Sequence, residues 1–476
     1  MEMTREELRI EDNATESKTN KENKTSELVN EFAGYTTLHG FHFVLESCSV
    51  VRRILWATLI ILALVILAFQ CLNGLNKLLE HDSMTIKEQQ REDATLFPAV
   101  TICNQNMLRK DKIMGTEAQK FLDEIESLLY NGFHNNTNDS FNLNLDKEVR
   151  RAGHNISDML IACFSQGKLC KPEDFYVFTS IRRGLCYTFN SGKPGYALRY
   201  QRNAGRDKGL FLQLNAQPEQ YYGPFNMLEG TGFRVVIHDQ NDWPDVENYG
   251  MDISPGFSST IRVQRYKTIR LPPPYTPKCG ERKLAGTSNY SQSACLVECW
   301  TRLIISRCQC KVLGMVHLDE YKSLRYCGPR KFVSCVLSAE VNSTVESACG
   351  CPTKCETVTF NQQLSSASFP SRHVLPMLVR QANATAAVNA SAEFYDEIET
   401  ELRKRLLQLN IFYQSVVTEV TKEKPSYDIH AFGSDIGGNM GLFLGCSLLT
   451  IVEFLDLVLL ICLGNSKRGQ KIKASL

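Results

Sequence analysis

The sequence predicts a membrane protein with two transmembrane helices and a large, disulfide-rich α+β domain between them. Three observations support this fold class: an apolar segment near each end of the 476-residue chain, a long polar middle, and 18 cysteines. The 53 basic and 52 acidic residues leave a net charge of +1, which excludes the basic footprint of a nucleic-acid-binding domain. The sequence has no nucleophile–base motif, phosphate-binding glycine loop or HExxH motif, so we expect neither an enzyme nor a cofactor.

The first apolar segment covers residues 50–72 and the second covers residues 433–463. Each provides the ~20 residues that a helix needs to cross the hydrocarbon layer. A secretory signal peptide is the alternative for the first segment. It is disfavoured because the polar residues 1–49 precede the segment and no small-residue cleavage site follows it.

The charges that flank the two segments predict the topology. Arg52 and Arg53 lie at the start of the first segment, and Lys467 and Arg468 follow the second. An excess of Lys and Arg marks the cytoplasmic side. We therefore expect a multi-pass protein of the plasma membrane with cytoplasmic tails at residues 1–49 and 464–476, and with residues 73–432 outside the cell. Membrane lipid is then a partner of the chain.

The cysteines support an extracellular middle. Fourteen of them lie between Cys103 and Cys355, and an even number in an oxidising compartment predicts up to seven disulfides, although spacing alone does not fix the pairing. Zinc binding by the close cysteine pairs is the less favoured alternative. Seven glycosylation sequons agree with an extracellular location, at Asn135, Asn138, Asn155, Asn289, Asn342, Asn383 and Asn389.

Hydrophobic periodicity predicts several elements of the middle domain. Residues 96–103 and 232–239 have the β-branched or alternating pattern of strands, and residues 116–130 place apolar side chains on one helical stripe. A second amphipathic helix is expected over residues 393–409, followed by one strand over residues 410–421. No internal repeat is evident.

The second apolar segment is unusual for an anchor, because it has five glycines between residues 433 and 445 and two acids, Glu453 and Asp456. Small residues alone would indicate helix packing, but carboxylates in hydrocarbon need water or a partner. Together these features indicate the lining of a cation pathway, and since two spans cannot enclose a pore, several chains must assemble. The expected pore-lining residues are Gly433, Ser434, Asp435, Gly438, Glu453 and Asp456.

Four motifs in the right order resemble the degenerin/epithelial sodium channel superfamily, and its acid-sensing and peptide-gated branches most closely. They are His39-Gly40, FPAVTICN (97–104), LPPPY (271–275) and DIGGNMGLFLGCS (435–447). The resemblance covers nearly the whole chain.

This resemblance implies a homo- or heterotrimeric, amiloride-sensitive, sodium-selective channel, with a domain built of palm, finger, thumb, knuckle and β-ball parts. The selectivity filter of the family falls on Gly445, Cys446 and Ser447, where Cys446 replaces the usual Ala or Ser and leaves the selectivity open. The gating motif of the family falls on His39 and Gly40, which implies a re-entrant segment that lines the lower pore.

The resemblance also implies a disulfide connectivity. The implied pairs are Cys103–Cys186, Cys163–Cys170, Cys279–Cys355, Cys295–Cys351, Cys299–Cys349, Cys308–Cys335 and Cys310–Cys327.

The activating ligand stays open among three gating mechanisms. A proton sensor needs carboxylates close enough to raise one another's pKa, and the segments expected to sense acid hold only Glu229, Glu340 and Glu346, together with one histidine, His81. We therefore place a neuropeptide-gated channel first, a proton-gated channel second, and a constitutive or mechanically gated channel third. A non-conducting receptor subunit is disfavoured by the glycines and acids of the second segment.

Overall fold

The computed structural model of the protein describes residues 26–45, 49–132, 141, 143–223, 230–338, 349–377 and 392–473. The chain divides into two compact units. One is helical and comprises residues 1–84 and 425–476, and the other is the disulfide-rich unit of residues 85–424. We describe each unit by itself.

The helical unit is built around α3 (Val50–Glu80), which begins where the sequence predicted and continues eight residues beyond the expected end at residue 72. Its apolar side chains are exposed, with Ile54 62% and Phe69 63% accessible, as suits a helix whose solvent is lipid. Among the described residues, α3 is the one helix that is long and apolar enough by itself to cross a membrane.

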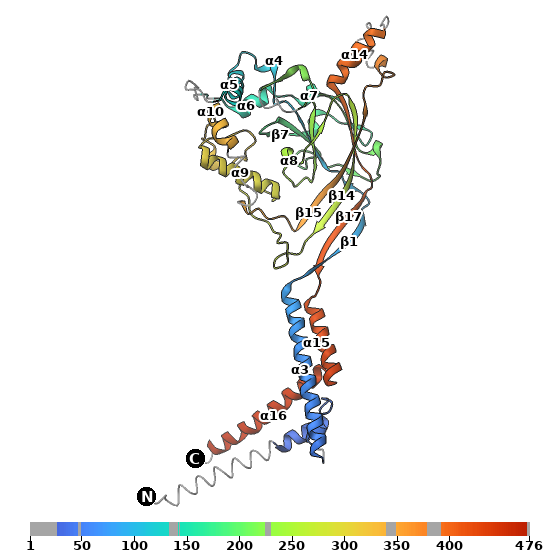
Figure 1. The fold of residues 1–476 in the computed structure, drawn as a ribbon, viewed down its shortest axis with the longest axis vertical. Coiled ribbons are helices and arrows are strands. Elements are labelled where there is room, and N and C mark those ends of the chain that lie inside the picture. The colour runs from blue at the N-terminus through green and yellow to red at the C-terminus, as the bar shows by residue number, and fades with distance from the viewer. Residues whose placement is uncertain are drawn as a thin grey trace, which may run out of the picture. The chain divides into compact units, whose positions relative to one another are not determined.

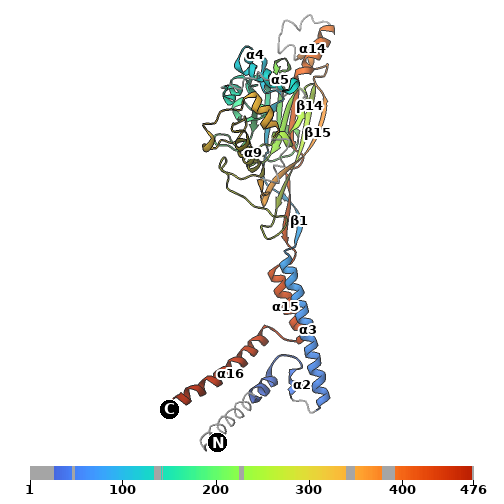
Figure 2. The ribbon, with the colours of Figure 1, turned by 60° about the vertical axis from the view of Figure 1, so that its left-hand side comes forward.

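The C-terminal part of the helical unit contains α15 (Ile429–Leu444) and α16 (Leu448–Lys473). α15 lies beside α3 (Figures 1 and 2), and Gly74 of α3 allows close contact with Phe432 and Tyr427. The two C-terminal helices are bent by 75° at the break between them, and they are long enough to span a membrane if they are counted as one broken span. The second span expected over residues 433–463 thus falls on two helices with a break at residues 445–447, and whether it crosses a membrane stays a prediction.

The N-terminal segment precedes α3 in the same unit. Residues 26–35 are helical, a turn follows at His39 and Gly40, and α2 (Phe41–Leu45) leads toward α3. Phe32 is fully buried and its ring meets that of Phe454 on α16, with 4.8 Å between the ring centroids. The chain thus folds back so that its N-terminal segment packs against the C-terminal helix.

The disulfide-rich unit contains an eight-stranded sheet in which the longest strands run side by side (Figure 1). Its central strand β14 pairs antiparallel with β15 but parallel with both β16 and β17. The strands in spatial order are β1 (Ser83–Arg91), β17 (Val417–Pro425), β14 (Phe257–Ile269), β16 (Leu406–Tyr413), β10 (Leu210–Asn215), β5 (Leu160–Ser165) and β6 (Lys168–Leu169), with β15 (Glu356–Ser368) on β14.

A second sheet has five strands and carries much of the buried core. The strands in order are β13 (Met251–Ile253), β12 (Phe233–His238), β3 (Ala99–Asn104), β8 (Gly184–Phe189) and β7 (Phe175–Ser180). Every residue of β3 and β8 is buried, because neighbouring strands cover both edges of each strand and other elements cover the faces. Phe233, Ile102 and Phe189 are among the largest side chains of this core.

Short elements complete the unit. Two-stranded pairs join β2 (Thr95–Leu96) with β9 (Tyr200–Gln201) and β4 (Leu108–Arg109) with β11 (Tyr221–Tyr222). The helices are α4 (Lys110–Ile113), α5 (Glu117–Asn131), α6 (Leu145–Ala152), α7 (Ile156–Met159), α8 (Val246–Tyr249), α9 (Gln292–Cys308), α10 (Pro329–Lys331) and α14 (Ala392–Arg405).

Most of the predicted elements are confirmed. The helix over residues 116–130 is α5, and the strands over residues 96–103 and 232–239 correspond to β2, β3 and β12. Two predictions near residue 410 are wrong. The helix expected over 393–409 ends at Arg405 because residues 406–409 belong to β16, where Leu407 and Leu409 are fully buried. The single strand expected over 410–421 is interrupted between β16 and β17 at residues 414–416.

The structure joins the fourteen cysteines in the seven pairs that the resemblance implied. Four of these bridges tie α9 and the short turn after it to the segments around residues 327–351. This region has few strands, so covalent links supply constraints that a small core cannot.

Candidate functional site

The predicted selectivity residues form the break between α15 and α16. Gly445 adopts a left-handed conformation, with φ of 61° and ψ of 19°, and its N–H still donates to the Gly441 carbonyl. A glycine in this conformation commonly ends a helix, because a side chain there is strained. Ser447 then starts the next turn, since its N–H donates to the Thr450 hydroxyl at 2.9 Å and its carbonyl accepts from the Thr450 N–H at 3.0 Å.

His39 lies directly against this break. Its backbone N–H donates to the Leu444 carbonyl at 3.2 Å. A Cβ atom built on Gly445 would lie 1.8 Å from the Nδ1 atom of His39, so only a glycine fits beside the ring. Gly40, with φ of 83°, is similarly close to the ring of Trp56 on α3. The two halves of the predicted gating motif therefore contact the break between α15 and α16 and the first apolar helix, α3. Their place in a membrane stays a prediction.

Cys446 is buried and Ser447 is exposed within the single chain. The Cys446 thiol points toward the Met440 carbonyl, with 3.6 Å between sulfur and oxygen. Of the three other cysteines outside disulfides, Cys71 and Cys462 lie in the described helices, and Cys48 lies outside the described residues.

Glu453 is held by the N-terminal segment. Its carboxylate accepts from the Thr37 N–H at 3.0 Å and from the Thr36 hydroxyl at 3.1 Å, and the Thr37 hydroxyl also lies 2.5 Å from that of Thr450. Hydrogen bonds to a carboxylate are stronger than those between neutral groups. A carboxylate that the sequence places in hydrocarbon thus has partners in its own chain, while Asp456 is exposed. That either acid lines a pore stays a prediction.

The predicted pore-lining residues at the other end of α15 are exposed: Gly433, Ser434, Asp435 and Gly438. The Tyr427 hydroxyl donates to Asp435 at 2.7 Å, and this bond raises the pKa of Tyr427 to about 12. This bond joins Asp435, in the second turn of α15, to the residue that precedes the helix by two positions.

Of the predicted sensing residues, His81 lies among the described residues. His81 ends α3 in a left-handed conformation, with its Nδ1 atom 2.6 Å from the Leu79 carbonyl oxygen. The other three, Glu229, Glu340 and Glu346, lie outside the described residues. The same holds for the sequons at Asn135, Asn138, Asn342, Asn383 and Asn389, whereas Asn155 and Asn289 are exposed.

Sequence reasoning missed a pair of carboxylates on the loop that follows β12. Asp242 is half-buried there and its backbone N–H donates to the Asp239 carbonyl at 3.0 Å. Burial and the nearby charge of Asp239 raise the pKa of Asp242 to about 6. The two acids in the segment DQND (239–242) were the signal, but the loop that carries them contacts residues 289–291, which are distant in the sequence.

Two hydrogen bonds attach this loop to α9 and the residues before it. The Trp243 N–H donates to the Ser291 hydroxyl at 3.2 Å, and the Asn289 side-chain amide donates to the side-chain Oδ1 atom of Asn241 at 3.1 Å. Ser291 also caps α9 by accepting from the Ala294 N–H. The loop thus connects the five-stranded sheet to the disulfide-linked helix.

Comparison with known proteins agrees with these observations. The sequence model of the amiloride-sensitive sodium channel family matches residues 32–457. Acid-sensing ion channel 1 of Gallus gallus is 30% identical over 461 residues, which cover 90% of this chain and 83% of that protein. Acid-sensing ion channel 1A of Danio rerio is 29% identical, covering 89% of this chain and 86% of that protein, and acid-sensing ion channel 2 of Rattus norvegicus is 29% identical, covering 90% and 85%.

Among solved structures, a proton-activated chloride channel aligns over 86% of this chain and 98% of that chain, with 9% identity and a TM-score of 0.31. That similarity is too weak to inform the fold. The match to the family over residues 32–457 and the identity to its acid-sensing relatives lead to one conclusion: the chain belongs to the amiloride-sensitive sodium channel family, within the degenerin/epithelial sodium channel superfamily.

Proposed function

We propose that the chain is one subunit of a trimeric, sodium-selective, amiloride-sensitive channel of the plasma membrane that extracellular protons open. In this proposal α3 and the broken pair α15–α16 are the two spans, both termini are cytoplasmic, and residues 85–424 are extracellular. The flanking Lys and Arg residues, the exposed apolar surface of α3 and the seven disulfides support this arrangement.

The pore would form where three copies of the α15–α16 break meet. A helix break exposes backbone carbonyl groups, which replace part of the hydration shell of a cation. Gly445 and Ser447 add no bulk at that point. The contact of His39 with Gly445 would hold each break in position. The hydrogen bond between Thr37 and Glu453 would attach the N-terminal segment to α16.

The raised pKa of Asp242 is the observation that supports proton gating. Asp242 lies in the loop after β12 and lines a cavity together with residues before and in α9, and burial together with Asp239 raises its pKa to about 6. It is charged at neutral pH and becomes neutral as the pH falls through about 6. The folded protein binds this proton more tightly than the unfolded chain does. Protonation of Asp242 therefore stabilises the folded protein in acid, and this contribution is lost as the pH rises through about 6.

The charged groups around Asp242 are few. Asp239 raises its pKa and Lys354 lowers it, and Lys354 is itself 3.5 Å from Glu281. The cavity beside Asp242 is also lined by Lys193, His238, Arg150 and His317. His238 is neutral near physiological pH, because burial lowers its pKa to about 4. Protonation of Asp242 thus removes the repulsion between two carboxylates at a contact that links the sheet to α9.

The names of the relatives and the environment of Asp242 favour protons over the peptide ligand that the sequence alone suggested. The test is to express the chain by itself in oocytes and to record amiloride-sensitive currents during acid steps from about pH 7.5 to about pH 5. Acid steps should open the channel. Asp242→Asn, which mimics the protonated form, should move the half-activation pH upward and make the response less steep.

Asp319→Asn is the matched control, because Asp319 is 92% exposed and, among the described residues, its ion pair is with the nearby Lys322; it should leave the half-activation pH unchanged. Acid-evoked currents that are identical in the Asp242 and Asp319 variants would remove Asp242 as the sensor. Currents that require a peptide and ignore acid would refute proton gating altogether.

A further inference from the structure

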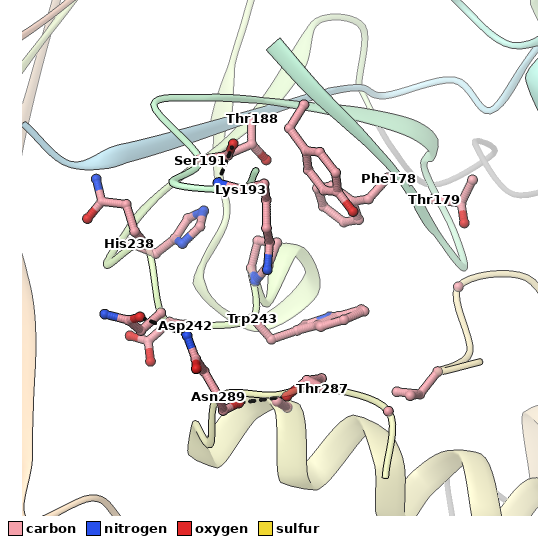
Figure 3. Close-up of a pocket in the computed structure, with 18 of the residues that line it drawn as sticks. Phe178, Thr179, Thr188, Ser191, Lys193, His238, Asp242, Trp243, Thr287 and Asn289 are labelled. Carbon is pink, nitrogen blue, oxygen red and sulfur yellow. Dashed lines mark hydrogen bonds between the residues drawn. The ribbon is translucent and has the colours of Figure 1, made fainter. Parts of the chain in front are cut away.

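The disulfide-rich unit contains a cavity of about 460 Å³ between the five-stranded sheet and the start of α9 (Figure 3). Its inner wall includes buried residues such as Thr188 of β8 and Ala294 of α9. Three exposed residues also line it: Asn241, Ser288 and Asn289. A residue that lines a cavity and is exposed as well lies at the opening, so these three residues form part of the rim.

Asn289 is held at this rim by several hydrogen bonds. Its side-chain Nδ2 atom donates to the Oδ1 atom of Asn241 at 3.1 Å, and its backbone carbonyl accepts from the Thr287 hydroxyl at 2.6 Å. The next residue, Tyr290, is buried, and its hydroxyl donates to the Pro352 carbonyl. Figure 3 shows Asn289 and Thr287 on the segment that leads into α9. The side chain of Asn289 therefore has a defined position between two segments that are distant in the sequence.

Asn289 is also the first residue of the glycosylation sequon Asn289-Tyr290-Ser291. The Ser291 hydroxyl is buried, and it accepts from the N–H groups of Trp243 and Ala294. Because the hydroxyl of a sequon takes part in its recognition, the folded protein does not present this sequon to a glycosyltransferase. A glycan at Asn289 must therefore be added before this region of the chain folds.

The folded protein has room for a glycan at this position. Asn289 is exposed, and one Nδ2 hydrogen bonds to Asn241 while no described residue takes the other. In the transfer, Nδ2 forms a bond to the anomeric carbon of a lipid-diphosphate-linked oligosaccharide, the bond from that carbon to the diphosphate breaks, and one Nδ2 proton is lost. The remaining hydrogen keeps the bond to Asn241, which fixes the position of the first sugar at the rim.

We propose that Asn289 carries an N-linked glycan and that this glycan covers the opening of the cavity, so that water and small ions enter while bulky molecules do not. An N-linked glycan is bulky and strongly hydrated, and one attached at the rim occupies the solvent directly outside the opening. The inference rests on the extracellular location of residues 85–424 proposed above. It does not depend on which ligand activates the channel.

The other sequon among the described residues, Asn155-Ile156-Ser157, provides a matched control. Asn155 is exposed and caps α7 by accepting from the Ser157 N–H at 3.0 Å, but it does not line the cavity. Glycopeptide mass spectrometry of the full chain, expressed in eukaryotic cells that make high-mannose glycans, should find sugar on both asparagines. Sugar on neither would overturn the extracellular location together with this inference. Sugar on Asn155 but not on Asn289 would overturn the inference alone.

Access to the cavity is measured at Lys193, which is exposed and lines it, with Lys322, 76% exposed, as the internal reference. The probes are two N-hydroxysuccinimide esters, one that transfers an acetyl group and one that transfers a long biotinylated polyether, and peptide mass spectrometry is the readout. Relative to Lys322, the bulky ester should label Lys193 about tenfold less in the glycosylated wild-type chain than in Asn289→Gln, as expected for a cover that is displaced about 10% of the time. The acetyl ester should label Lys193 equally in both.

Ser157→Ala removes the control sequon and keeps the Asn155 cap, so its labelling should equal that of the wild type. Should Asn289→Gln fail to fold, the wild-type chain alone still decides the question. Trimming its glycans to the first sugar with an endoglycosidase should increase the labelling of Lys193 by the bulky ester. Bulky labelling that is the same before and after trimming, or the same in Asn289→Gln and the wild type, would overturn the proposal.

Discussion

The contact between Gly445 and His39 gives the sharpest test of the pore arrangement. Replacing Gly445 with alanine adds one methyl group at a backbone with φ of 61°, and an L-residue in the left-handed region costs roughly 1–2 kcal/mol. The new Cβ would lie 1.8 Å from the His39 Nδ1 atom and 2.4 Å from its Cγ atom. The ring must therefore move, and forced overpacking of this kind costs about 1–3 kcal/mol more.

The two costs together are about 2–5 kcal/mol, which lowers the equilibrium constant for forming this arrangement by roughly 30-fold to 3,000-fold at 1.4 kcal/mol per factor of ten. We expect Gly445→Ala to reduce the maximal amiloride-sensitive current, by at most that factor, while surface biotinylation shows normal expression. The double variant Gly445→Ala/His39→Ala lacks the clashing ring, so only the backbone cost of roughly 1–2 kcal/mol should remain, and current should partly recover relative to Gly445→Ala.

Gly441→Ala is the matched control. Gly441 is in α15, and a Cβ there meets nothing within 4 Å, so alanine should be tolerated. The reasoning is refuted by a Gly445→Ala channel with wild-type current and wild-type Na⁺/K⁺ permeability ratio. A double variant no better than the single one would show that the His39 contact is not the cause of the loss.

Three further predictions concern other parts of the chain. Gly209→Ala should lower the thermal stability of the purified chain by about 1–3 kcal/mol, because its Cβ would lie 2.0 Å from the Ile411 carbonyl oxygen; Gly280→Ala, with open space around it, should be neutral, and equal melting of the two would contradict the packing. Glu453→Gln should speed hydrogen–deuterium exchange at the Thr37 amide by about fivefold, the effect of losing ~1 kcal/mol when a charged acceptor becomes neutral, and unchanged exchange would show that this bond does not form. Mass spectrometry without reduction should find no free thiol among the fourteen disulfide-bonded cysteines, and several reduced thiols there would contradict an oxidising compartment.

The sequence by itself determined the features that depend on composition and short-range pattern. Two apolar segments and a cysteine-rich middle predicted the fold class, because membrane solvation and redox compartment act on composition. Local periodicity predicted α5 and β12, whose apolar residues repeat with the period of a helix or a strand. The motif at residues 445–447 marked these residues as special within the second apolar segment. It did not predict that the helix would break there.

Only the tertiary structure decided the features that depend on distant partners. The helical pattern that begins at residue 393 continues through residues 406–409. These residues nevertheless form part of β16, which pairs with β10 and β14 and is largely buried. His39 reaches Gly445, and Thr37 reaches Glu453, across some 400 positions of the chain. The loop that carries Asp242 likewise contacts Ser291, the cap of α9, some fifty positions away. Burial, hydrogen bonding and the pKa of a carboxyl follow from which surfaces meet in space, and one sequence read locally does not contain that information.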